Sequence, residues 1–213
     1  MNTKKLTTVA MLSAMAYVLM FISKAIPAVE GFLQYDAKDV AITIGGFMLS
    51  PLYAFIISIV VSVLEFLTVS HTGFIGLVMN IISTAAFACT ASFIYHKIKN
   101  IKGAFLSLGV ATIILTAVML LWNYYVTPIY MNIPREVIKP MLTTVFLPFN
   151  LVKGLINSGF ILFTYKPIVS GLQKTGLVHT QTAQKKMFMP ALITGIVLVV
   201  IFIPVILHMA NVL

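Results

Sequence analysis

The chain has 213 residues, of which 60% are hydrophobic and 9% are charged. Soluble domains carry about 25% charged residues, so this composition excludes an ordinary soluble protein and indicates an all-α integral membrane protein. The net charge of +9 could suit nucleic acid, but the lysines are scattered along the chain and only one arginine is present. We therefore expect a lipid bilayer around this protein and no nucleic-acid partner.

Apolar runs of about 20 residues, the length that crosses ~30 Å of hydrocarbon, divide the chain into membrane helices. The first run covers residues 6–23, and the stretch 40–95 is long enough for three crossings. The first of these three, residues 39–49, is short for a full span and contains Gly45-Gly46, so we expect it to be tilted or flanked by irregular backbone. Three further spans are predicted at about residues 104–127, 144–165 and 187–207.

These runs predict two regions in the chain. Residues 1–174 form a six-helix membrane domain, and residues 175–213 form a polar linker with an additional apolar helix. We expect the additional helix to cross the membrane, with an interfacial helix as the alternative. The sequence leaves open whether Pro148 begins the sixth helix, where its missing N–H is no loss, or lies in a longer one that it kinks.

The placement of the lysines orients the predicted helices. With three crossings in residues 40–95, nine lysines fall on one side, which the positive-inside rule identifies as the cytoplasm. These nine are Lys4, Lys5, Lys97, Lys99, Lys102, Lys166, Lys174, Lys185 and Lys186. The opposite side carries Lys24, Lys38, Arg135 and Lys139 beside four acids. The N-terminus is therefore predicted to be cytoplasmic.

Lys153 is a charged residue inside an apolar run. A lysine within a membrane span costs several kcal/mol, so it usually faces a cavity and marks a ligand or ion path. On a helix, Asn150, Lys153, Gly154 and Asn157 fall at i, i+3, i+4 and i+7 and share one face. This stripe predicts the wall of a polar pocket that opens outward, with snorkelling of Lys153 to the outer headgroups as the alternative.

Other segments place candidate contacts near the same membrane face. Asn123, an amide within an apolar helix, needs hydrogen-bond partners from a ligand or from a neighbouring helix. Asp36 and Asp39 fit the N-cap and first turn of a helix as well as they fit ligand contact. The aromatic candidates are Phe32, Tyr35 and Tyr125. Glu65 and His71 lie near the outer end of the third helix, where the alternatives are a pocket, a proton-handling and an interfacial role, and we favour the interfacial one.

Several chemistries lack their motifs. The chain has no G-x-x-x-x-G-K-[ST] loop for nucleotide phosphates, no H-E-x-x-H pair for zinc and no G-x-S-x-G elbow. We therefore expect no ATP hydrolysis, no metal site and no cofactor, so energy for transport has to come from a partner. Ala10 and Ala14, small residues at i and i+4 of the first helix, are candidates for docking such a partner.

Four segments resemble the riboflavin-specific S component of energy-coupling factor (ECF) transporters. They are residues 33–40 (LQYDAKDV), the glycine-rich second helix leading to Pro51, residues 122–125 (WNYY) and above all residues 147–154 (LPFNLVKG). The resemblance covers about residues 4–172 and does not extend to the carboxyl-terminal apolar run.

The resemblance implies a six-helix vitamin binder that opens outward from the plasma membrane of a prokaryote, with riboflavin as the transported ligand. The residues that it assigns to flavin contact, or to the loop beside the flavin, are Leu33, Tyr35, Asp36, Asp39, Asn123, Asn150 and Lys153. Phe32 is added as a stacking partner and Asn157 on helical geometry alone. The implied partners are a membrane coupling (T) subunit and two ATP-binding-cassette ATPases.

Two hypotheses of different class remain open at this point. The first is a high-affinity riboflavin-binding subunit of an ECF-type transporter, or an S component for a different vitamin. The second is a small membrane enzyme or secondary carrier that uses the buried Lys153 with Glu65 and His71, because a desolvated lysine can act as a base.

Overall fold

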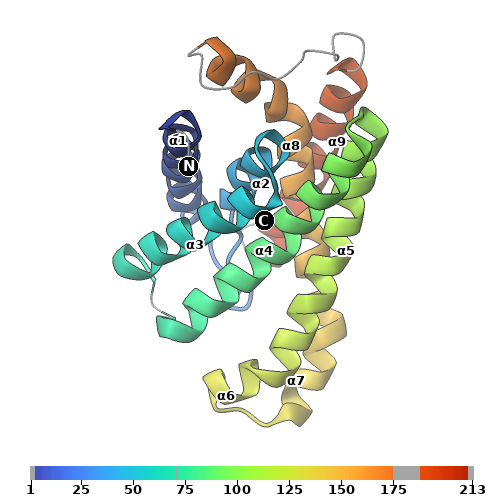
Figure 1. Ribbon diagram of the computed structural model, residues 1–213. Helices are drawn as coiled ribbons and strands as arrows, with labels where there is room; N and C mark the ends of the chain where they lie inside the picture. The colour runs from blue at the N-terminus through green and yellow to red at the C-terminus, as the bar shows by residue number, and fades with distance from the viewer. Residues whose placement is uncertain (1–2, 71, 175–187, 211–213) are drawn as a thin grey trace.

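The structure is a computed structural model that describes residues 3–70, 72–174 and 188–210. In these ranges the chain is helical and contains no strand, and its helices pack as one bundle (Figure 1). In chain order they are α1 (Thr3–Ser23), α2 (Lys38–Met48), α3 (Pro51–Thr68), α4 (Gly73–Ile98), α5 (Ile101–Tyr125), α6 (Thr127–Met131), α7 (Arg135–Met141), a π-helical turn (Leu142–Phe146), α8 (Leu147–Lys174) and α9 (Phe188–Met209).

Six helical segments are long and apolar enough to cross a membrane. They are α1, α3, α4, α5, the continuous helix Arg135–Gly171 and most of α9. Together with the short α2, these segments confirm the predicted all-α architecture of a six-helix bundle with an additional apolar helix. The linker 175–187, which includes Lys185 and Lys186, and also His71 lie outside the described residues.

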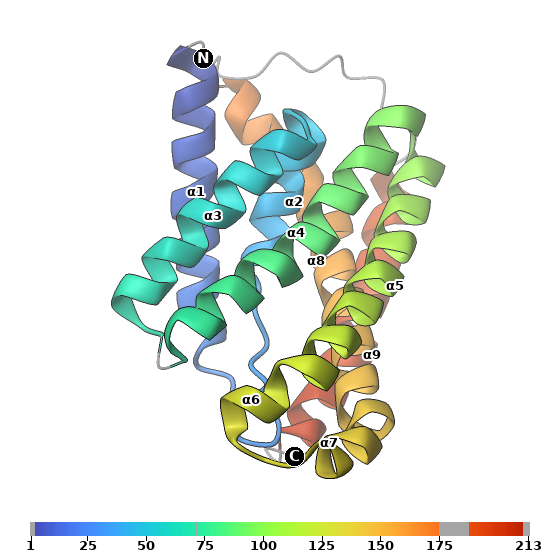
Figure 2. The same cartoon turned by 60° about the horizontal axis from the view of Figure 1, so that its bottom comes forward.

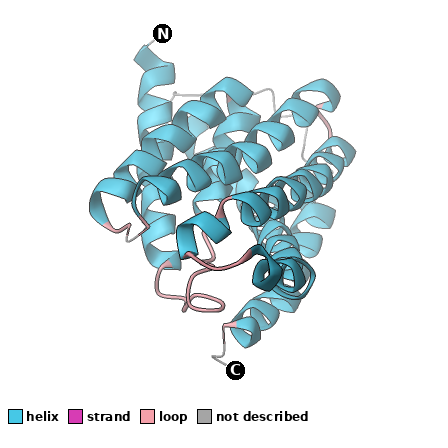
Figure 3. Cartoon of the chain, turned by 90° about the horizontal axis from the view of Figure 1, so that it is seen from below, coloured by secondary structure: helices cyan, strands magenta, loops and turns pink. Residues whose placement is uncertain are grey.

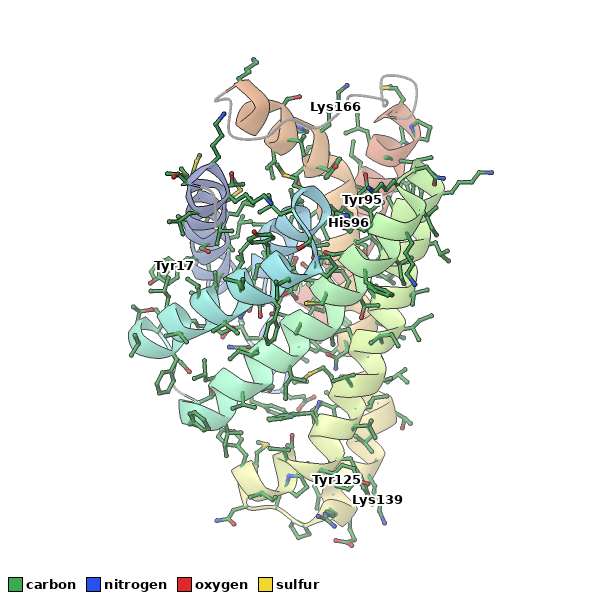
Figure 4. The ribbon with its side chains drawn as sticks, in the orientation of Figure 1. Tyr17, Tyr95, His96, Tyr125, Lys139 and Lys166 are labelled. Carbon is green, nitrogen blue, oxygen red and sulfur yellow. The ribbon has the colours of Figure 1, made fainter. Side chains whose placement is uncertain are left out.

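The bundle has two distinct ends. The start of α1 and the end of α9 lie at opposite ends (Figure 2 and Figure 3). Lys166, Tyr95 and His96 lie toward the end where α1 begins, whereas Tyr125 and Lys139 lie at the other (Figure 4). The segment of residues 24–37 that joins α1 to α2, here called the binding loop, lies at this second end (Figure 2).

The short helix α2 is an internal element. It has 11 residues, which corresponds to about 16 Å at 1.5 Å per residue, and residues 38–47 are all buried. It packs against α1, α3, α4 and α8. At Gly46 an added Cβ would lie 1.9 Å from Ser92 Oγ and 2.9 Å from Ala54 Cβ, so the glycine permits this packing. Because its neighbours surround it, α2 does not need the length of a lipid-facing span.

Pro148 lies inside a longer helix and does not begin one. The helix extends over Arg135–Gly171, beyond the predicted range 144–165. Proline lacks the N–H that would bond four residues back, and its ring crowds that carbonyl. The π-helical turn just before Pro148 changes the local hydrogen-bond pattern, so that the helix continues past the proline. In this turn the Leu147 N–H donates to the Leu142 carbonyl five residues back. Of the two alternatives for Pro148, a position inside a longer helix is therefore the observed one.

Candidate ligand-binding site

A cavity of about 350 Å³ lies between the binding loop and helices α3, α4, α5, α6 and α8. Small-molecule sites typically measure about 300–1,000 Å³. Its aromatic lining consists of Phe32, Trp122, Tyr130 and Phe149. Its polar lining includes Lys24, Gln34, Asp36, Glu65, Asn80, Ser83, Asn123, Asn150 and Lys153. Such a wall suits a small molecule with a flat apolar body and polar edges.

The polar stripe predicted on α8 is confirmed as one buried face. Asn150, Lys153 and Asn157 are 3%, 7% and 0% exposed. The Lys153 Nζ donates to Ser83 Oγ at 3.4 Å and lies 3.8 Å from Asp39 Oδ2. Snorkelling of Lys153 to the headgroups is therefore wrong, because its ammonium is held inside the bundle.

Gly154 brings α8 close to α5 beside this stripe. A Cβ at this position would lie 2.6 Å from Thr112 Cγ2 and 2.9 Å from Thr112 Oγ1. Small residues at helix crossings allow such close packing in membranes. The glycine of the stripe thus sets the spacing between two helices that line the cavity.

Of the nine predicted ligand contacts, six lie on the cavity wall. These six are Phe32, Leu33, Asp36, Asn123, Asn150 and Lys153. The other three, Tyr35, Asp39 and Asn157, lie behind the wall and are 5%, 0% and 0% exposed. Tyr125 is 54% exposed and does not line the cavity.

The three residues behind the wall connect the binding loop to α8. The Tyr35 Oη donates to Asn157 Oδ1 at 2.7 Å, and Asn157 Nδ2 donates to the Asp36 carbonyl at 3.2 Å and to Asp39 Oδ2 at 3.3 Å. Burial, together with the charges of Asp39 and Asp36, raises the pKa of Tyr35 well above its ordinary value. Its hydroxyl therefore stays protonated and donates, so that these groups position the loop and Lys153.

Two of the wall amides, the predicted contacts Asn123 and Asn150, are held by hydrogen bonds to residues four positions away. Asn123 Nδ2 donates to the Met119 carbonyl at 2.7 Å, and Asn123 Oδ1 accepts from Thr127 at 2.8 Å. Asn150 Nδ2 donates to the Phe146 carbonyl at 2.7 Å. An amide carries two N–H donors and an acceptor oxygen, so each amide is held in place with hydrogen-bonding capacity left for a ligand. Of these bonds of Asn123, the one to Met119 stays within α5 and the other joins Thr127 at the start of α6, four residues further along the chain.

Sequence reasoning missed a buried ion network beside the cavity. Glu65 Oε1 lies 2.8 Å from Lys24 Nζ, and Glu65 Oε2 accepts from Lys38 Nζ at 2.6 Å. Lys38 pairs with Asp36 as well. Lys24 precedes most of the binding loop and Lys38 follows it, so one carboxylate ties both ends of the loop to α3.

Two sequence-based expectations are therefore wrong. Glu65 is 2% exposed and is not an interfacial group, and Lys38 is 0% exposed and does not face the outer solution. The physical reason is that the fold supplies each charge with an opposite partner inside the bundle. A signal was present, because Glu65 is an acid within an apolar run, as Lys153 is a base within one.

The network is balanced in charge. By formal charge, its three bases match its three acids, which are Lys24, Lys38 and Lys153 on one side and Asp36, Asp39 and Glu65 on the other. Burial alone would raise the pKa of Asp36, but the ammonium groups of Lys38 and Lys153 bring it below its ordinary value. Asp36 therefore stays ionised beside the cavity.

A bundle of apolar helices around a polar cavity defines a membrane-embedded binder of a small molecule. Residues 4–169 match the family model described as the ECF transporter substrate-specific component. The chain belongs to this family and is a multi-pass membrane protein. The family predicted from residues 147–154 is thus confirmed.

Individual relatives agree with this assignment. The riboflavin transporter RibU of Staphylococcus aureus (strain TCH60) is 31% identical over 179 residues, which cover 81% of this chain and 94% of the relative. The riboflavin transporter FmnP of Bacillus subtilis (strain 168) is 30% identical over 191 residues, or 84% and 100% of the two chains. A solved structure described as "Structure and mechanism of the S component of a bacterial ECF transporter" has a TM-score of 0.69 and 31% identity, and the match covers 81% of this chain and 99% of that chain.

Replacing Glu65 with alanine should destabilise the protein, because the substitution leaves Lys38 buried with one carboxylate fewer. Breaking a buried ion pair by removing one partner costs about 3 kcal/mol. We expect a lower midpoint of thermal unfolding for Glu65→Ala in detergent. The matched control is Glu136→Ala, which removes an exposed acid of α7 and should leave the midpoint unchanged. Equal midpoints for both variants would contradict a stabilising role of the Glu65 pairs.

Proposed function

We propose that this chain is the riboflavin-binding subunit of an ECF transporter, which captures the vitamin at the outer face and delivers it inward with an energy-coupling module. The observation that carries the proposal is the buried Lys153 beside Asn150 and Asn123 on the wall of one cavity. The names of the two relatives, which match over 81% and 84% of this chain, support riboflavin as the ligand.

The cavity wall complements the chemistry of riboflavin. The polar edge of the isoalloxazine ring presents carbonyl groups and an imide N–H, which asparagine amides such as Asn123 and Asn150 match with donors and acceptors. The flat ring suits stacking on aromatic side chains, for which Phe32 and Trp122 are available on the wall. The ribityl hydroxyls suit hydrogen bonds to Lys153 or Asp36.

The charge balance of the site favours an uncharged ligand. Burying an unpaired charge is costly, and a buried charge normally has a partner. Because the three lysines and three acids already neutralise one another, a neutral vitamin adds no net charge to the bundle. An anionic ligand would require part of this network to rearrange.

Asn150→Ala and Lys153→Ala should each weaken riboflavin binding. Losing one hydrogen bond to a ligand costs about 1 kcal/mol for a neutral donor and ~2 kcal/mol for a charged one, so we expect affinity to fall by roughly fivefold for Asn150→Ala and roughly thirtyfold for Lys153→Ala. Titration by quenching of flavin fluorescence measures both. The wild-type protein purified in mild detergent should be yellow.

The control for this series is Lys139→Ala, which removes an exposed lysine at the loop-bearing end and should bind riboflavin as the wild type does. Wild-type protein that neither carries nor quenches riboflavin would overturn the proposed ligand. Folded Asn150→Ala and Lys153→Ala variants with wild-type affinity would instead overturn the assignment of the wall residues.

We also propose the orientation of the bundle in a prokaryotic plasma membrane. The end where α1 begins faces the cytoplasm, as the positive-inside rule requires of the end that carries most of the lysines. The binding loop then faces outward, where the vitamin is captured. Seven crossings, counting the short α2 and α9, bring the end of α9 to the exterior.

We therefore expect a reporter that needs the cytoplasm to be active when it is fused before Met1. A reporter that needs the exterior should be active when it is fused after Leu213. Paired fusions to alkaline phosphatase and to a fluorescent protein that requires the cytoplasm measure this. A cytoplasmic result after Leu213 would contradict the crossing of α9.

The proposed energising partners are a membrane coupling subunit and two ATP-binding-cassette ATPases. Ala10 and Ala14 are both exposed on α1 and are the candidate docking surface for the coupling subunit. Small residues let a partner helix approach closely. Because α1 and α9 lie on different sides of the bundle (Figure 1), the additional helix leaves this surface open.

Replacing Ala10 and Ala14 with leucine should abolish riboflavin uptake while leaving riboflavin binding by the lone subunit intact, because the added side chains keep the partner helix away. Uptake in cells and co-purification of the partner subunits measure the effect. The matched control is Gly109→Leu on α5, where no other group lies within 4 Å of an added Cβ. Normal uptake by the Ala10 and Ala14 variant would exclude this surface as the dock.

A further inference from the structure

Helix α9 lies outside the part of the chain that matches the family. The family model ends at residue 169, before α9 begins at Phe188. The proposed function makes no use of α9, yet the helix packs along α8, which carries the stripe of Asn150 and Lys153. The helix therefore lies where it can support the binding site from behind α8.

One face of α9 packs against the bundle along its whole length. The buried or half-buried positions on this face are Ala191, Gly195, Leu198, Phe202 and Ile206, and the buried Ala210 follows directly after the helix. Their spacing of three or four residues is that of a single helical face. An added Cβ at Gly195 would lie 2.7 Å from the Gly159 carbonyl oxygen, so two glycines allow the helices to approach closely. The opposite face exposes side chains such as Ile193, Val200 and Ile201.

The two halves of α9 join different parts of the core. Ala191 and Leu198 belong to a cluster with residues of α5 and with residues of the second half of α8, such as Ile161 and Leu162. Ile206 and Ala210 belong instead to a cluster that contains Val29, Leu33 and Tyr35 of the binding loop, together with Phe149 and Val152 of α8. The end of α9 lies near the binding loop in two views (Figure 2 and Figure 3). Leu33 and Phe149 also line the cavity, so α9 supports the back of its wall.

The binding loop depends on such support. It contains no helix, and its tip is a turn with Glu30 and Gly31 at φ values of 51° and 76°. The tip is closed by two hydrogen bonds of 2.9 Å between the backbones of Val29 and Leu33. Segments of this kind open locally at low free-energy cost unless apolar contacts hold them. Ion pairs hold the two ends of the loop, and the apolar cluster holds its middle.

We propose that α9 is an added buttress that keeps the binding loop closed over the ligand, with Ile206 as the positioning residue. Ile206 is 1% exposed, so its side chain is a well-packed member of the shared cluster. Ile206 does not line the cavity. It is connected to the cavity wall through the loop and α8 residues of the shared cluster. The part of this inference that concerns retention of riboflavin rests on the proposed function, whereas the part that concerns loop closure does not.

Ile206→Ala tests the buttress in the full chain reconstituted in lipid nanodiscs. Hydrogen exchange followed by mass spectrometry measures how often the ligand-free loop opens. Stopped-flow recovery of flavin fluorescence measures the rate of riboflavin dissociation. We expect faster exchange in residues 29–33 and dissociation about tenfold faster, which is the factor that ~1.4 kcal/mol produces. Ile206→Leu conserves side-chain volume and should restore both values.

Two variants separate this role from a general loss of packing. Leu198→Ala removes a packing side chain from the inner half of the same face, and Ile201→Ala removes one that is 54% exposed. Both should keep wild-type loop exchange and dissociation. Unchanged loop exchange in Ile206→Ala, or the same acceleration in Leu198→Ala, would overturn the buttress. Faster exchange with an unchanged dissociation rate would overturn its role in retaining the ligand.

The failure of the proposed function would look different. If the wild-type protein binds no riboflavin, dissociation has no signal, but hydrogen exchange in the ligand-free Ile206→Ala and Leu198→Ala variants still decides whether α9 closes the loop. The two proposals therefore stand or fall on separate measurements.

Discussion

Three lysines and three acids lie together within a bundle that consists mainly of apolar helices. In such surroundings a charge without a partner is far more costly than in water, so each member of the network constrains the others. Glu65 draws Lys24 and Lys38 to α3, Asp36 pairs with Lys38, and Asp39 faces Lys153. The pairs of Glu65 tie both ends of the binding loop to α3, and the Lys153–Asp39 pair holds the Lys153 ammonium inside the bundle.

The same compensation shapes the cavity. Because the formal charges of the bases and acids balance, the wall offers polar groups without a net formal charge, and its amides Asn123 and Asn150 are held by backbone carbonyls four residues earlier. Aromatic surface completes the lining. These properties agree with membership of the ECF substrate-specific components and with a ligand that is flat, polar at its edges and uncharged. The ion network is thus part of the specificity of the site as well as part of its framework.

Helix α9 belongs to the apolar cluster at the middle of a loop whose two ends are held by ion pairs. Its outer end shares a hydrophobic cluster with the loop and with α8, while its inner half packs in a separate cluster. A loop held both by ion pairs at its ends and by apolar burial at its middle has two independent constraints. A family member that lacks such a helix has to hold the loop by other contacts.

Local features of the sequence determined the membrane class, the order of the long helices and the buried stripe of Asn150, Lys153 and Asn157. The length of an apolar run and the spacing of residues on a helix depend only on residues close together in the chain, so the sequence pattern predicts both. The tertiary structure alone decided which distant charges meet. Glu65 pairs with Lys38 across 27 positions, and Tyr35 bonds Asn157 across 122. It also decided that Pro148 lies inside a longer helix and that Ile206 shares an apolar cluster with residues of the binding loop. Such outcomes depend on how helices assemble, and a pattern of single residues does not encode which partner an interior charge will find.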